Sequence, residues 1–130
     1  MYLLDLDNTL HHASSHILPE INRQMTRYLQ NALGLPQEHA SQLRTHYWVQ
    51  HGATLLGMMT HHGTDPHHFL HHTHQFDNLQ VLSHRPGHVP QRLRRLPGLR
   101  VLLTNAPKAY ATELLKVLGL FSCVDAVVAI

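Results

Sequence analysis

Three short apolar runs, separated by segments with helical periodicity, constrain the fold of this chain more than any other feature. The runs occupy residues 1–6, 99–103 and 124–130, and polar or turn-forming residues bound them. Runs of this length are typical of buried strands. Strands connected through helices pair in parallel, because a parallel connection must return to the same end of the sheet. The pattern therefore predicts an α/β protein built on a parallel sheet.

A long stretch with only helical patterns separates the first run from the second. Apolar residues at spacings of three and four predict a helix over 19–33, which Gly34 and Pro36 end. Further helices are expected over 36–51, with Trp48 on the inner side, over 53–62, and over 66–75, with Thr64 as N-cap. A loop over 76–87 leads to helices at 89–96 and 107–118. We therefore expect an all-helical insertion after the first strand.

Composition narrows the class of protein. The 43% of hydrophobic and 14% of charged residues suit a folded domain. No apolar run approaches the roughly 20 residues of a membrane helix, and no secretory signal is recognisable, so we expect no membrane partner. The single cysteine, Cys123, fits a cytoplasmic protein and a buried position. Net charge is +2. The clustered arginines have no aromatic residues among them, which favours a solvated helix face over a nucleic-acid partner.

Two aspartates directly follow the first predicted strand. Asp5 and Asp7 lie at its carboxyl end, where open parallel sheets bind ligands. Carboxylates so close together repel each other unless a cation lies between them, and Mg²⁺ prefers such oxygen ligands. Asp5 would then attack phosphorus as a nucleophile, and Asp7 would protonate the leaving oxygen and later deprotonate a water molecule. This arrangement predicts phosphoryl chemistry.

A hydroxyl and an amide follow the second predicted strand. Thr104 and Asn105 lie at the same edge of the sheet as Asp5 if the strands are parallel. Such groups, with exposed backbone N–H groups, suit the binding of phosphoryl oxygens.

These residues carry a family resemblance. The stretch 5–9, Asp-Leu-Asp-Asn-Thr, resembles the first motif (DxDxT) of the haloacid dehalogenase superfamily, and the stretch 102–105, Leu-Leu-Thr-Asn, resembles its second motif. Stretches 46–48, 52–57, 61–66, 104–107 and 118–120 are similar to the pyrimidine 5′-nucleotidase branch. The resemblance implies a partial Rossmann-like core, residues 1–15 and 85–130, with an all-helical cap, residues 16–84, inserted after the first strand.

The resemblance also implies a function. It is that of a Mg²⁺-dependent phosphatase that hydrolyses a small phosphate monoester through an aspartyl-phosphate intermediate. The leading candidate substrate is a pyrimidine nucleoside 5′-monophosphate. Asp5 would be nucleophile and metal ligand, and Asp7 would be acid/base and would bind the metal through its carbonyl. Thr104 and Asn105 would bind the phosphoryl group. His46 and a neighbouring tyrosine, Tyr47, are the candidates for substrate contact from the cap.

Two further motifs of the superfamily supply a lysine and a second set of acidic residues, and both would follow the strand at 124–130. We therefore expect the 130 residues to be a C-terminally truncated piece that is poorly soluble and inactive alone. Lys108 and Lys116 lie on the wrong helix to replace that lysine, and Asp125 opens a strand at the end opposite the site.

Two alternatives stay open. Another phosphatase of the superfamily, for example one acting on phosphoglycolate, would share every catalytic residue. The 15 histidines also allow a non-catalytic metal-binding module, with His67/His71, His68/His72 and His71/His74 at helical spacing, although polar cap surface explains these pairs better. The sequence predicts no oligomeric state.

Overall fold

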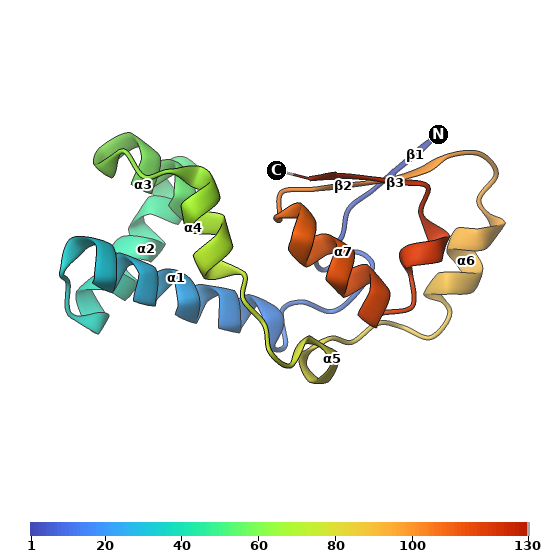
Figure 1. Ribbon diagram of the computed structural model, residues 1–130, viewed down its shortest axis with the longest axis horizontal. Coiled ribbons are helices and arrows are strands. Elements are labelled where there is room, and N and C mark those ends of the chain that lie inside the picture. The colour runs from blue at the N-terminus through green and yellow to red at the C-terminus, as the bar shows by residue number, and fades with distance from the viewer. Residues whose placement is uncertain (130) are drawn as a thin grey trace. The chain divides into compact units, whose positions relative to one another are not determined.

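The computed structural model describes residues 1–129 of the chain, which form two compact units (Figure 1). The first contains Met1–Pro19 and Phe76–Ile130, and the second contains Glu20–Gln75. The sequence-based division placed residues 16–84 in the insertion, so the second unit is narrower than that range at both ends. Among residues 1–129, no helix is long and apolar enough to cross a membrane.

A parallel sheet forms the centre of the first unit. Its strands are β1 (Tyr2–Leu4), β2 (Arg100–Thr104) and β3 (Ala126–Ala129), in the spatial order β1-β2-β3. Leu4 pairs with Leu102, and Thr104 pairs with Ala129. The expected α/β class and parallel pairing are confirmed within the described chain. Strand β1 is shorter than the predicted run 1–6, because the chain leaves the ladder at Asp5.

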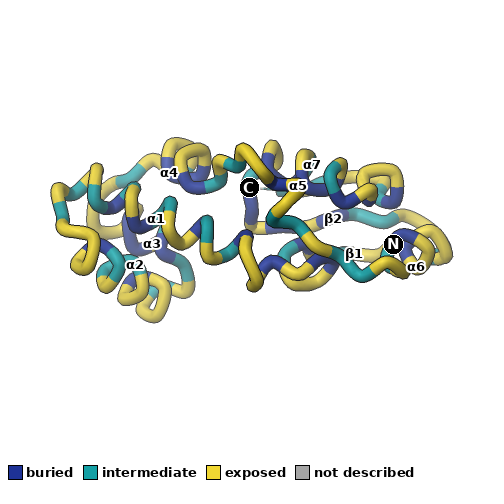
Figure 2. Tube along the Cα trace, turned by 90° about the horizontal axis from the view of Figure 1, so that it is seen from below, coloured by how far each residue is buried: buried dark blue, intermediate teal, exposed yellow. Residues whose placement is uncertain are grey.

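One face of this sheet is covered and the other is open. Four helical segments belong to the first unit besides the start of α1: α5 (Leu79–Leu82), α6 (Val89–Arg95), α7 (Lys108–Val117) and the 3₁₀ turn η1 (Phe121–Cys123). Figure 1 shows α7 along one face of the sheet. Leu102 and Leu114 are fully buried, as is Cys123, which confirms its predicted core position. On the opposite face Leu3, Leu103 and Val128 are each at least half exposed, and Figure 2 shows β1 exposed or partly exposed throughout.

Four helices form the second unit around one apolar core. They are α1 (Ile17–Leu33), whose first turn belongs to the first unit, α2 (Gln37–His51), α3 (Thr54–His62) and α4 (Pro66–Thr73). Gly52 and Gly63 end α2 and α3 in the left-handed conformation, as glycine permits. The core residues are Leu29, Ala40, Tyr47, Met58, Phe69 and Leu70.

Three local predictions were wrong. Trp48, expected on the inner side of α2, is 61% exposed, because Tyr47 takes the buried position beside it. The N-cap of α4 is Asp65 rather than Thr64, since its carboxylate accepts a hydrogen bond from the His68 N–H at 2.7 Å. The expected loop over 76–87 contains α5, whose Leu79 side chain is buried.

Candidate active site

The loop after β1 is braced by its own side chains. Leu6 and Leu10 are buried and anchor it, and both the Thr9 and the Leu10 N–H groups donate to the Leu6 carbonyl. Asn8 adopts a positive φ of 60°, which asparagine tolerates better than most residues. The Asn8 Oδ1 accepts from the N–H groups of Ala13 and Ser14 at 2.9 and 3.0 Å. Both aspartates therefore project from a fixed turn.

The two aspartates have different surroundings. Asp5 is exposed, and its Oδ2 accepts a hydrogen bond from the Thr9 hydroxyl at 2.7 Å. Asp7 is only partly exposed, and its Oδ1 lies 2.8 Å from the His11 Nε2 and accepts a 2.8 Å hydrogen bond from the Tyr110 hydroxyl. A carboxylate that faces solvent suits attack on a substrate, whereas one held by two neighbours suits controlled proton transfer.

Tyr110 connects this loop to the segment that follows β2. Its side chain is almost completely buried on α7, 103 residues along the chain from Asp7. Burial, and next the nearby Asp7 carboxylate, raise the pKa of Tyr110 well above its ordinary value. The phenol therefore keeps its proton across the neutral range and remains a hydrogen-bond donor to Asp7.

His11 is the second partner of Asp7. Its side chain is fully buried, and the Nδ1 atom of its ring has no hydrogen-bond partner. An unpaired buried nitrogen destabilises the folded state, because it has lost its hydrogen bond to water. The Nε2 contact with Asp7 is the polar interaction that offsets this cost.

Thr104 and Asn105 end the strand beside β1. Because the strands are parallel and Leu4 pairs with Leu102, the carboxyl ends of β1 and β2 lie at one edge of the sheet. The buried Thr104 hydroxyl oxygen accepts a hydrogen bond from the Ala106 N–H at 3.1 Å, and Asn105 is exposed. The Tyr110–Asp7 hydrogen bond joins the two segments that leave this edge.

The oxygen atoms at this edge suit a hard cation only in part. Within residues 1–129, no group of three or more His, Cys, Asp or Glu side chains is arranged to hold a metal ion. The Oδ1 of Asp7 already faces two donors. A Mg²⁺ ion there would depend on the Asp5 carboxylate, a backbone carbonyl, water and substrate oxygens, which is a normal composition for magnesium sites.

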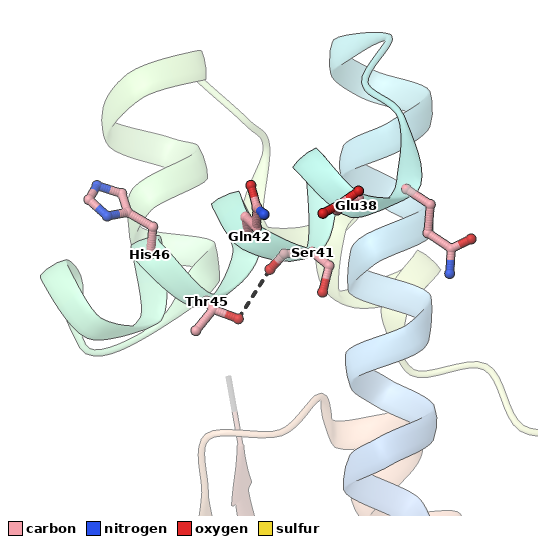
Figure 3. Close-up of a pocket in the computed structure, with 6 residues that line it drawn as sticks. Glu38, Ser41, Gln42, Thr45 and His46 are labelled. Atoms are coloured by element: carbon pink, nitrogen blue, oxygen red, sulfur yellow. Dashed lines mark hydrogen bonds between the residues drawn. The ribbon is translucent and has the colours of Figure 1, made fainter.

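The two candidates from the second unit differ from each other. His46 is exposed and lines a shallow depression on the outer face of α2, with Glu38, Gln42 and Thr45 (Figure 3). The Thr45 hydroxyl there donates to the Ser41 carbonyl of the same helix. Tyr47 is 6% exposed and packs against Gly57. Its ring serves the core of the second unit, so only His46 presents its side chain to solvent.

His11 and Tyr110 were not assigned to the site from the sequence. His11 lies four residues after Asp7, a spacing that suggests contact when the loop is helical. Tyr110 carries no comparable signal, because only the pairing of β1 with β2 brings α7 to the loop.

No protein-family model matches this chain.

Proposed function

We propose that this chain carries part of the active site of a Mg²⁺-dependent phosphatase of the haloacid dehalogenase type, acting on a small phosphate monoester. The observation that carries the proposal is the Asp5–Asp7 pair at the end of β1, joined through Tyr110 to the segment after the neighbouring parallel strand. A pyrimidine nucleoside 5′-monophosphate is the leading substrate, by the resemblance of residues 46–66 to that branch.

The proposed reaction has two steps. An oxygen of Asp5 forms a bond to phosphorus, the bond from phosphorus to the ester oxygen breaks, and Asp7 gives its proton to the leaving alcohol. Asp7 then takes a proton from a water molecule, which attacks the phosphorus of the aspartyl-phosphate and releases inorganic phosphate and Asp5. Mg²⁺, bound by the Asp5 carboxylate and the Asp7 carbonyl, would supply screening of the phosphate charge.

The neighbours of Asp7 have defined tasks in this scheme. Tyr110 and His11 contact the Oδ1 atom, which leaves the other carboxyl oxygen of Asp7 for the proton transfer. Thr104 and Asn105 would bind phosphoryl oxygens at the end of β2.

The test uses the whole product of the gene that encodes this chain, with a panel of uridine, cytidine and adenosine 5′-monophosphates and phosphoglycolate. We expect Mg²⁺-dependent phosphate release, greatest with the pyrimidine nucleotides. Asp5→Asn should abolish it, and Asp7→Asn should lower kcat by about 10²–10⁴-fold, the usual contribution of acid–base catalysis.

A matched control is Asp77→Asn, which changes an exposed aspartate in the same unit and should leave the rate unchanged. A preference for phosphoglycolate would instead favour the phosphoglycolate-type phosphatases of the superfamily. Absence of phosphate release from the whole panel, or full activity of Asp5→Asn, would overturn the proposal.

A further inference from the structure

Four histidines surround the buried Tyr47 of the second unit. His46 and His51 belong to α2, and His61 and His62 belong to the last turn of α3. The Tyr47 ring lies parallel to that of His61, with centroids 5.3 Å apart and an interplanar angle of 7°. The Tyr47 hydroxyl lies 2.7 Å from the His62 Nε2. One core side chain thus organises several imidazole rings at the surface.

Two of these rings direct the same nitrogen at each other. The Nε2 atoms of His51 and His61 are 3.2 Å apart, and their rings meet at 67° with centroids 5.2 Å apart. Two imidazole nitrogens bound to one tetrahedral Zn²⁺ at its usual bond lengths lie roughly 3.3 Å apart. The separation of the two nitrogens is therefore already the one that a shared metal ion requires.

The local packing holds this pair in place. Tyr47 is buried and packs so closely against Gly57 that an added Cβ would lie 2.3 Å from its ring, so the tyrosine cannot shift further towards α3. His61 stacks on that fixed ring, and His51 contacts the same ring edge-on at 5.9 Å. Rigid support of this kind lowers the ordering cost of metal binding.

The pair on α4 differs in this respect. The rings of His68 and His72 are tilted with respect to each other, with centroids 4.2 Å apart and planes 33° apart. The Nδ1 of His68 faces the Tyr28 hydroxyl, and the Nδ1 of His72 faces the His68 carbonyl. Both Nδ1 atoms therefore already have hydrogen-bond partners, whereas His51 and His61 place two nitrogens beside each other.

We propose that His51 and His61 form a binding site for a borderline divalent transition-metal ion, of the Zn²⁺ or Cu²⁺ class, with water in the remaining positions. Imidazole favours these ions over Mg²⁺. Metal binding replaces the hydrogen bond between the two Nε2 atoms, so both rings carry their proton on Nδ1 in the bound form. The site has two protein ligands, in agreement with the lack of any larger ligand group among residues 1–129.

The test is a calorimetric titration with Zn²⁺ of the whole product of the gene that encodes this chain. The double variant His51→Gln/His61→Gln removes the site, whereas His67→Gln/His71→Gln removes two exposed histidines at helical spacing on α4. We expect the tightest Zn²⁺-binding step to weaken by about tenfold or more, or 1.4 kcal/mol, in the first variant and to stay within twofold in the second. Mg²⁺ should produce no such step.

A second measurement needs no variant. At substoichiometric Zn²⁺, the Nε2 resonances of His51 and His61 should be the first imidazole signals to shift in the nitrogen-15 spectrum of the wild-type chain. An unchanged tightest step in the first variant, an equal loss in the second, or first shifts at α4 histidines would each overturn the proposal. Neither measurement involves phosphatase activity, so their outcomes are independent of the function proposed above.

Discussion

The two units satisfy their buried polar groups in different ways. In the second unit, the hydroxyls of Thr26, Thr54 and Thr73 donate to backbone carbonyls, two of them only four residues away. In the first unit, Asp7, His11 and Tyr110 form a network that joins residues 103 positions apart. Local hydrogen bonds of the first kind stabilise helices and need no ligand. A carboxylate that accepts a hydrogen bond from a residue far along the chain is the arrangement expected at a site of chemistry.

This contrast separates the second unit, which serves as a framework, from the first unit, which contains the candidate site. The second unit buries apolar side chains and leaves its histidines exposed or partly exposed. The first unit retains an unpaired nitrogen on the fully buried His11. Proteins retain such costly features where function requires them.

The largest effect should come from the core of the second unit. Phe69 is fully buried and contacts the Tyr28 ring edge-on at 4.9 Å. Phe69→Ala should lower the free energy of unfolding by about 3–5 kcal/mol, the usual cost of an aromatic cavity. Urea unfolding followed by circular dichroism measures the loss, and hydrogen exchange should place it in α1–α4. Leu56→Ala, at a half-exposed position on α3, is the control and should cost less than about 1 kcal/mol.

A smaller effect tests the contrast directly. Tyr110→Phe keeps the ring but removes a donor from the Asp7 carboxylate, so unfolding should become easier by about 1–2 kcal/mol. Thr73→Val is the matched variant. It removes the hydroxyl that donates to the Phe69 carbonyl, but that carbonyl lies within α4 and keeps its backbone donor. It should cost less than Tyr110→Phe, about 0.5 kcal/mol, the lower end of the usual net contribution of one hydrogen bond. Equal losses in the two variants would remove the distinction between local and long-range networks.

The smallest effect concerns the sheet end opposite the site. Arg100 lowers the pKa of Asp125, through its guanidinium and its backbone N–H, which both donate to the carboxylate. Because the folded pKa lies below the unfolded one, this stabilisation is complete above about pH 4 and is lost as the pH falls through the folded value. Asp125→Asn should therefore be less stable than wild type at pH 7, and the difference should shrink towards pH 2.

Denaturation midpoints measured from pH 7 to pH 2 check this expectation. A constant difference between Asp125→Asn and wild type across that range would contradict it. Asp77→Asn serves as the control, because Asp77 lies in an exposed loop of the same unit.

The sequence predicted those features that depend on local patterns. Apolar runs located the three strands, and Gly34 marked the end of α1, because glycine readily adopts the conformation that terminates a helix. Parallel pairing followed from the helical connections. Asp125, which was expected to open a strand, directly precedes β3 and pairs with Arg100 at the start of β2.

The sequence did not predict the features that depend on tertiary packing. Trp48 and Tyr47 are adjacent aromatic residues, and the packing of α2 on α3 buries Tyr47 against Gly57 and leaves Trp48 exposed. Tyr110 reaches Asp7 because α7 packs near the loop after β1, a contact that no spacing along the chain encodes. The 3.2 Å approach of His51 and His61 likewise depends on the way α2 and α3 meet.

The most direct test of the central claim is to trap the covalent intermediate on Asp5. The whole gene product is mixed with a ³²P-labelled pyrimidine nucleoside 5′-monophosphate and Mg²⁺, quenched in acid within one turnover, and digested for mass spectrometry. We predict an acid-stable, base-labile phosphoryl group on the peptide that contains Asp5, absent from Asp5→Asn. Label on any other residue, or turnover without label on Asp5, would contradict the account.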